Sequence, residues 1–146
     1  MEEYYTLEVA GLTRQLKRYP ISDKLDIAAF ILFGDVEMTI ACARELLKKA
    51  PDFDVIFTPE AKSIPLAYEM ARQSGKPYIV ARKGVKVYMS DPIKAAVHSI
   101  TTKKEQYLYV GQEDASQMRG KRILVVDDVI STGDSLGAMQ DLATQA

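Results

Sequence analysis

The chain has 146 residues, of which 47% are hydrophobic and 27% are charged, and these values fit one globular domain with one packed core. A formal net charge of -1 excludes the broad basic surface of proteins that grip nucleic acid, so no nucleic-acid partner is expected. No stretch approaches the roughly 20 apolar residues that span a bilayer, and no basic segment leads into an apolar run at the N-terminus. Cys42 is the single cysteine, so the composition predicts a reducing, cytoplasmic location and no membrane partner.

The first 33 residues are predicted to form a small appendage of one single domain that covers residues 1–146, since no repeat or composition break divides the chain. From Asp35 to Lys49 the apolar residues recur at helical spacing, and Pro51 stops the pattern. This spacing predicts an amphipathic helix with Cys42 buried on its apolar side.

Strands and helices then alternate along the chain. Short apolar runs predict strands at Asp54 to Thr58, Tyr78 to Ala81 and Arg122 to Val126. Helical patterns follow the first and last of them, at Ile64 to Gln73 and Ser135 to Ala143. Apolar strands alternating with helices indicate an α/β fold with a parallel sheet buried on both faces, similar to a Rossmann fold.

A polar insertion separates the second and third of these strands. Arg82 to Pro92 is irregular, while Ala96 to Thr101 and Tyr107 to Val110 read as the arms of a hairpin with a charged TKKEQ tip. We expect this insertion to be exposed and mobile.

The most informative segment is ILVVDDVISTGDS, from Ile123 to Ser135. A strand that ends in two acidic residues and leads through a Ser-Thr-Gly loop into a helix places its polar groups at the carboxyl edge of the sheet, where open α/β folds bind ligands. The loop amides and hydroxyls suit a phosphate at a helix N-terminus. Asp127 and Asp128 can accept hydrogen bonds from a sugar diol or face a magnesium-bound group. The segment therefore predicts a ribose phosphate site.

Other interpretations of this segment remain open on the residues alone. Two acids after an apolar strand also occur in receiver-like domains and in phosphate-loop NTPases, although the G-x-x-x-x-G-K-[ST] loop of the NTPases is absent. The acids could also form a solvated strand end, with STGD as the cap of the next helix.

VVDDVISTGDS resembles the signature with which type I phosphoribosyltransferases bind 5-phosphoribosyl-1-pyrophosphate (PRPP). Upstream, TPEAKSIPLA at Thr58 to Ala67 resembles the loop that takes the pyrophosphate, and ARKGVKVYM at Ala81 to Met89 resembles the basic strand end of the purine enzymes. The resemblance covers about two thirds of the chain. It implies the parallel-sheet fold of that family, with residues 83–110 as a flexible hairpin lid and residues 1–33 as a possible hood.

The resemblance also implies roles for individual residues. Asp127 and Asp128 would bind the ribose hydroxyls, with Mg²⁺ arriving on PRPP near them and no cage of protein ligands. Arg82 and Lys83 would stabilise the leaving pyrophosphate, so these two and the two acids are the catalytic candidates, with Lys86 as a further possibility. The residues expected at the 5-phosphate are Ser131, Thr132, Gly133, Asp134 and Ser135, and those at the pyrophosphate are Glu60, Ala61, Lys62, Ser63, Arg82 and Lys83.

The lid would close over the reacting centre, where His98, Lys103, Lys104 and Glu105 are candidates for contacts. Its sequence, HSITTKK, has Thr101 where adenine enzymes carry the glutamate of SYSLEYG, and it is more similar to the YSFTKQ of xanthine enzymes. ISTGDS, in contrast, is closer to the adenine and archaeal hypoxanthine types, which leaves the base open among the purines. Aromatic residues between Tyr4 and Phe33 are candidates to stack on it.

The predicted function is transfer of the 5-phosphoribosyl group from PRPP to a purine base in purine salvage, by a homodimer. The alternatives are a PRPP-binding regulator without catalysis and an orotate-type enzyme. Relatives continue into at least one further strand after the helix that ends this chain, so the fold is expected to be shortened at the C-terminus, with reduced activity or stability.

Overall fold

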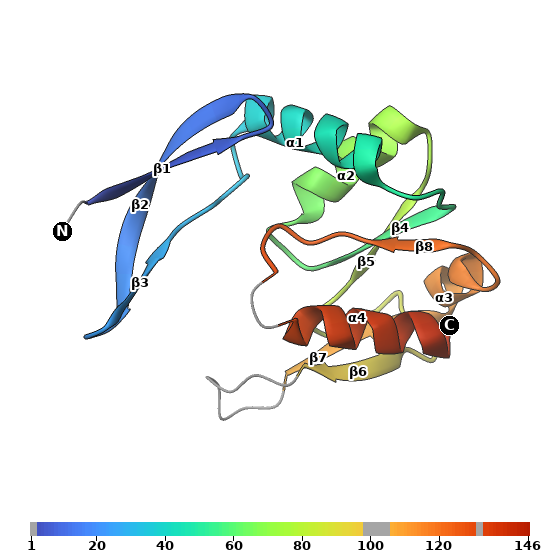
Figure 1. Cartoon of the computed structure of the whole chain (residues 1–146). Helices are drawn as coiled ribbons and strands as arrows, with labels where there is room; N and C mark the ends of the chain where they lie inside the picture. Colours follow the sequence, from blue (N-terminus) through green and yellow to red (C-terminus); the bar gives the residue numbers. More distant parts are fainter. Residues whose placement is uncertain (1–2, 98–105, 131–132) are drawn as a thin grey trace.

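A parallel sheet of three strands lies at the centre of the computed structural model, which describes residues 3–97, 106–130 and 133–146 (Figure 1). Strand β4 (Val55–Pro59) is the middle strand, and β5 (Tyr78–Ala81) and β8 (Ile123–Val125) pair with it in parallel on either side. All five residues of β4 are buried. The predicted α/β fold with a parallel sheet is therefore confirmed.

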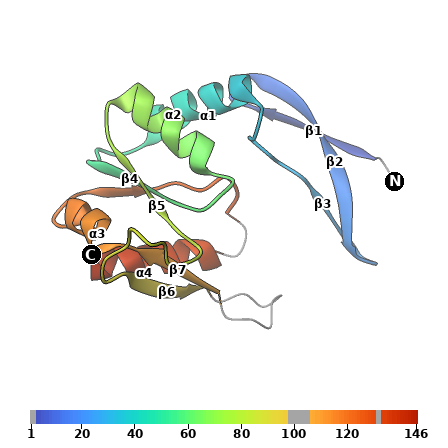
Figure 2. The same ribbon diagram turned by 180° about the vertical axis from the view of Figure 1, so that it is seen from behind.

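Helices α1 (Val36–Lys49) and α2 (Ile64–Ser74) cover one face of this sheet (Figures 1 and 2). Ile56 points into this layer, where it packs with residues from both helices, including Cys42 and Met70. Both helices were predicted, and the burial of Cys42 raises the pKa of its thiol. Cys42 is thus a packed core residue.

The other face of the sheet packs against helix α4 (Asp134–Gln145) and the antiparallel pair β6 (Ile93–Val97) and β7 (Gln106–Val110). Phe57 and Val55 alternate with Ile56 along β4 and reach this second cluster, which also holds Met139 and Leu142 of α4. Successive side chains of β4 therefore point to opposite faces of the sheet, and this buried strand contributes to the hydrophobic clusters on both faces.

The hairpin strands correct one prediction. Ala95 of β6 and Leu108 and Val110 of β7 are each at most 4% exposed, and β7 continues the central sheet through paired backbone bonds between Arg82 and Tyr109. The expectation that all of 83–110 is exposed is therefore wrong for its two strands, because their apolar sides complete the core. Residues 98–105 lie outside the described residues.

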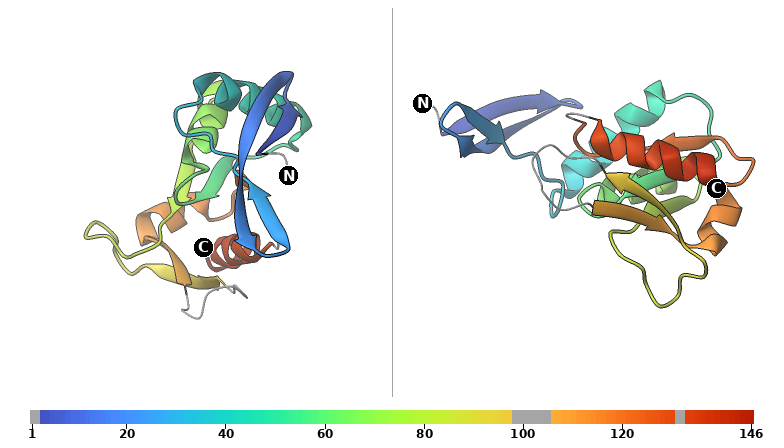
Figure 3. Two further views of the ribbon diagram at one scale, coloured as in Figure 1. Left: turned by 90° about the vertical axis from the view of Figure 1, so that its left-hand side faces the viewer. Right: turned by 90° about the horizontal axis from the view of Figure 1, so that it is seen from below.

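Residues 4–28 form a second, antiparallel sheet that extends from the body of the molecule (Figures 1 and 3). Its strands are β1 (Tyr4–Val9), β2 (Leu12–Ser22) and β3 (Leu25–Ala28). Ala10 and Gly11 both have positive φ, which is the geometry of a tight two-residue hairpin turn. Arg14 on β2 ties this sheet to the body through Asp35, the N-cap of α1, at 2.7 Å.

One short helix, α3 (Gln112–Met118), connects β7 to β8 and was not predicted. In the part of the chain that is described, no helix combines the length and the apolar character needed to cross a membrane.

Candidate active site

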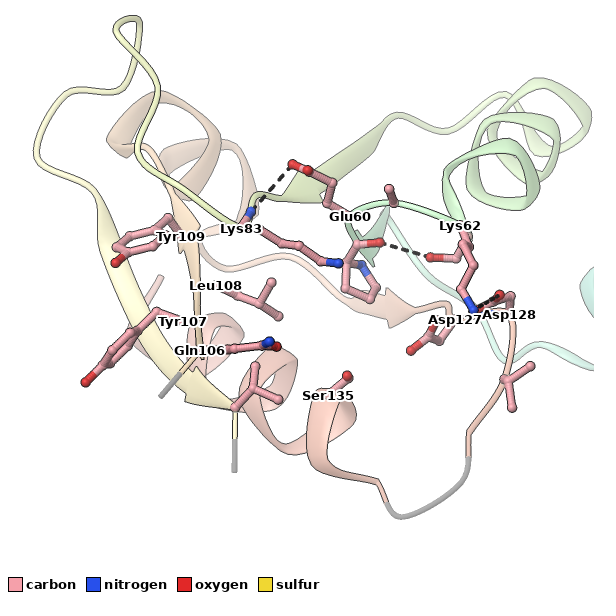
Figure 4. Close-up of a pocket in the computed structure, with 15 residues that line it drawn as sticks. Glu60, Lys62, Lys83, Gln106, Tyr107, Leu108, Tyr109, Asp127, Asp128 and Ser135 are labelled. Carbon is pink, nitrogen blue, oxygen red and sulfur yellow. Dashed lines mark hydrogen bonds and ion pairs between the residues drawn. The ribbon is translucent and has the colours of Figure 1, made fainter. Parts of the chain in front are cut away.

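A cavity of about 710 Å³ opens at the carboxyl ends of the three parallel strands (Figure 4). Three connections meet there: the loop between β4 and α2, the segment after β5, which contributes Lys83, and the segment between β8 and α4. A wall from the β6–β7 hairpin closes one side. The residues that line it are Pro59, Glu60, Ala61, Lys62, Ser63, Lys83, Val97, Gln106, Tyr107, Leu108, Tyr109, Asp127, Asp128, Val129 and Ser135.

A buried hydroxyl pair sets the conformation of the loop after β4. Thr58 Oγ1 lies 2.7 Å from Ser63 Oγ and 2.8 Å from the carbonyl oxygen of Val126, and Ser63 Oγ lies 3.0 Å from the carbonyl oxygen of Pro59. Two hydroxyl hydrogens can make only two of these three contacts at a time, and all the partners lie within the protein, so the pair is satisfied without a ligand. Ser63, which is 1% exposed, thus holds the loop while its neighbours face the cavity.

Two acidic side chains follow β8, as predicted. The amide of Asp128 donates to Asp127 Oδ1 at 2.8 Å. Burial, and secondarily the neighbouring Asp128 carboxyl, raise the pKa of Asp127 to about 6. Below that pH this carboxyl is mainly protonated in the unliganded protein.

Asp128 has an unsatisfied oxygen. Its side chain is 7% exposed, and Oδ2 has no hydrogen-bond partner among the described residues. Lys62 Nζ approaches this oxygen from the opposite loop at 4.0 Å, beyond hydrogen-bond distance (Figure 4). Because a buried carboxylate oxygen without a donor is costly, this geometry favours a ligand that donates a hydrogen bond at this point, or a hydrated cation.

The start of α4 forms the third side of the cavity. Gly133 is the N-cap residue and has φ of 83°, a left-handed conformation that suits glycine. Ser135 in the first turn lines the cavity, so a ligand there faces the positive end of the helix dipole. Ser131 and Thr132 lie outside the described residues.

The predicted basic pair splits into two different environments. Lys83 lines the cavity from the end of β5, whereas Arg82 is not among the lining residues. Arg82 Nε donates instead to Glu60 Oε1 at 2.6 Å, and its Nη1 donates to the Tyr88 hydroxyl. The other predicted residues outside the described lining are Gly133, Asp134 and Lys86.

The hairpin lies beside the cavity, but the sequence analysis did not identify which of its described residues line it. Gln106, Tyr107 and Tyr109 line the cavity, whereas the sequence analysis predicted a lid over residues 83–110 with Gln106 in its charged tip, and named none of these three as a site residue. The apolar alternation in QYLYV predicts a half-buried strand, but only the pairing of Tyr109 with Arg82 brings that strand beside the site. Among the described residues, none before Pro59 lines this cavity, so the N-terminal sheet does not contribute to it.

The donor set fits a magnesium ion that arrives with a phosphorylated ligand. Among the described residues no group of three or more potential metal ligands comes together. The orphan oxygen of Asp128 and the neighbouring Asp127 could still bind a hydrated ion that a polyphosphate largely coordinates. These two acids are the residues that would face it.

The order of these connections matches a sequence family. The family description "phosphoribosyl transferase domain" matches residues 37–144, which include both loops, Lys83 and both acids. The chain belongs to this family.

Curated relatives agree with this assignment. The chain is 36% identical over 122 residues to a hypoxanthine/guanine phosphoribosyltransferase of Methanocella arvoryzae, which covers 83% of this chain and 57% of the relative. It is 33% identical over 132 residues to HGPRTase-like protein 2 of Haloferax volcanii, covering 87% of this chain and 66% of that protein. The chain thus spans little more than half the length of the first of these relatives.

Solved structures share the fold. The adenine phosphoribosyltransferase of Thermoanaerobacter pseudethanolicus superposes with a TM-score of 0.69 at 19% identity, covering 89% of this chain and 76% of that one. The adenine phosphoribosyltransferase of Saccharomyces cerevisiae, solved with a bisphosphate imino compound and adenine, gives 0.66 at 21% identity with the same coverage. At these identities the likeness supports the fold of type I phosphoribosyltransferases.

Proposed function

We propose that this chain binds PRPP in the cavity and transfers its 5-phosphoribosyl group to a purine base, with release of pyrophosphate. The observation that carries the proposal is the meeting of Asp128 and Lys62 across one cavity. Asp128 comes from the segment after β8 and Lys62 from the loop after β4, and their charged groups lie 4.0 Å apart. Asp128 Oδ2 has no hydrogen-bond partner in the described structure. A ligand with a diol and an anionic group would use both.

In this proposal the ribose hydroxyls donate to Asp127 and Asp128, and the 5-phosphate lies at the start of α4 beside Ser135. Pyrophosphate lies between the β4 loop and Lys83, whose ammonium offsets the charge that develops as the bond from C1 to oxygen breaks. A nitrogen of the base forms the new bond to C1 as the bond from C1 to the pyrophosphate oxygen breaks, and the N–H proton of the base passes to the released pyrophosphate or to water. Magnesium, held mainly by the substrate, would offset further charge on the pyrophosphate.

Among purine bases we propose hypoxanthine or guanine first. Two relatives that are 36% and 34% identical are named hypoxanthine/guanine phosphoribosyltransferases, whereas the adenine enzyme with a similar fold is 19% identical. Stacking by the N-terminal sheet, a homodimer and a cytoplasmic place in purine salvage remain predictions.

The test is to mix the protein with PRPP, magnesium and each of hypoxanthine, guanine, xanthine, adenine and orotate, and to follow nucleotide formation by chromatography. We expect the corresponding monophosphate from hypoxanthine or guanine. Product from orotate alone would overturn the purine assignment. PRPP binding without product from any base would support the regulator instead.

A further inference from the structure

The Arg82 side chain is held at the rim of the cavity by two groups. Its Nε donates to Glu60 Oε1 at 2.6 Å, and Nη1 donates to the hydroxyl of Tyr88. Its backbone N–H and carbonyl group both pair with Tyr109 on β7, at 2.9 and 2.8 Å. Arg82 is thus fixed at both its backbone and its guanidinium.

The Arg82 guanidinium binds Glu60, an acidic side chain that lines the cavity. It lines the cavity beside Lys62, in the loop where the proposed function places pyrophosphate, and its side chain is 23% exposed. A carboxylate at that position repels a diphosphate. Arg82 and the backbone amide of Lys83, 3.5 Å away, both contact the same Glu60 oxygen (Figure 4 shows the second contact). The bond from Arg82 holds the pKa of Glu60 below its usual range, so the carboxylate stays charged and needs this partner.

We propose that Arg82 is a positioning residue, which neutralises Glu60 and holds it against the end of β5 so that the loop and Lys83 can receive pyrophosphate. This inference rests on the proposed function. It differs from the role that the resemblance implies, in which Arg82 itself contacts pyrophosphate. Lys83, which lines the cavity, is then the cation at the end of β5 that meets the ligand.

A double-mutant cycle separates the two roles. Arg82→Gln leaves the Glu60 charge beside the ligand, so we expect affinity for magnesium pyrophosphate to fall roughly tenfold. Arg82→Gln combined with Glu60→Gln removes that charge, and the affinity should return to within about threefold of wild type. If Arg82 contacts the ligand directly, the double variant stays as weak as Arg82→Gln, and the proposal is overturned.

Two controls keep the result specific. Ribose 5-phosphate uses the acids and the start of α4, so its affinity should be unchanged in Arg82→Gln, in Glu60→Gln and in the double variant. An equal loss for both ligands would overturn the proposal. Arg44→Gln is the charge control: it changes the net charge by the same amount as Arg82→Gln, but in an exposed ion pair with Glu45 on α1. Its affinity for pyrophosphate should equal that of the wild type.

Calorimetric titration of the full chain gives these affinities, and a thermal scan of each variant confirms that it folds. If Arg82→Gln does not fold alone, the double variant is compared with Glu60→Gln, since neither variant leaves an unpaired charge at position 60. Affinities within about threefold support the positioning role, and a weaker double variant overturns it. A wild-type chain that binds neither PRPP nor pyrophosphate would contradict the proposed function itself. Wild-type binding with no loss in Arg82→Gln would contradict only the positioning role.

Discussion

Asp127 links the chemistry of the site to pH. Its pKa is about 6 in the folded protein and 3.8 in the unfolded reference, so the folded state holds more protons between these values. The stabilisation associated with this carboxyl is therefore complete below about pH 4 and is lost as the pH rises through about 6. A diol that donates hydrogen bonds to the Asp127 carboxylate favours its charged form and so lowers the pKa of this carboxyl.

We expect Asp127→Asn to remove this part of the pH dependence. Relative to wild type, the variant should gain melting temperature at pH 7, on the order of a few degrees, and gain less at pH 4.5. Thermal scans across this range measure the difference, with Asp141→Asn on the exposed side of α4 as a control. A wild-type advantage that grows toward pH 7 would contradict the assignment of a raised pKa to the partly buried Asp127 carboxyl.

At the scale of single elements, the Thr58 hydroxyl connects β4, β8 and the loop that follows β4. Thr58→Val keeps the shape of the side chain but leaves the Val126 carbonyl and the Ser63 hydroxyl with one partner fewer. We expect a loss of about 1–3 kcal/mol in the free energy of unfolding and weaker pyrophosphate binding. Denaturant titration measures the first effect. Stability equal to wild type would show that this network does not fix the loop.

The start of α4 depends on the backbone at Gly133, where φ is 83°. Open space surrounds the position of an added Cβ, so Gly133→Ala tests the backbone alone, and we expect a loss of about 1 kcal/mol. Gly137→Ala provides the matched control, because Gly137 lies inside the same helix, also has open space and should gain about 0.5–1 kcal/mol. Equal effects of the two changes, measured by denaturant titration, would contradict this account of the helix start.

The elements predicted best are those whose pattern is local. The helix at 36–49 has a cap at Asp35 and a proline beyond its end, and the apolar runs at β4 and β5 were correct within one or two residues. α3 was missed because its seven residues contain only two buried side chains, Ala115 and Met118. The N-terminal strands were missed because polar residues alternate along the chain through Ser22, and this pattern does not show where one strand ends and the next begins. Only the pairing of β1, β2 and β3 defines those ends.

At the scale of the whole molecule, sequence reasoning placed the site on three connections and predicted a lid over it, but it could not identify which hairpin residues line the cavity. Each of these connections follows an apolar strand in the sequence, which predicts that it lies at the carboxyl edge of the sheet. The structure brings the two acids, the loop after β4 and Lys83 together in one cavity. The hairpin wall depends on a long-range pairing between Arg82 and Tyr109, and no local pattern encodes it. The same long-range geometry turns Arg82 toward Glu60.

The two ends of PRPP can be tested separately because its halves are available as ribose 5-phosphate and pyrophosphate. Lys62 pairs with Asp128, so its removal disturbs both ends, and Lys83 on the other side of the cavity is the cleaner probe of the pyrophosphate end. Asp128→Asn removes the carboxylate that would accept from the ribose diol.

The most direct test of the account is therefore a crossed titration of Asp128→Asn and Lys83→Ala with ribose 5-phosphate and magnesium pyrophosphate. We predict that Asp128→Asn weakens ribose 5-phosphate binding at least tenfold, on the order of a lost charged hydrogen bond, and changes pyrophosphate binding less. Lys83→Ala should show the reverse pattern, and both should weaken PRPP. Unchanged ribose 5-phosphate affinity in Asp128→Asn would contradict the assignment of this cavity to PRPP.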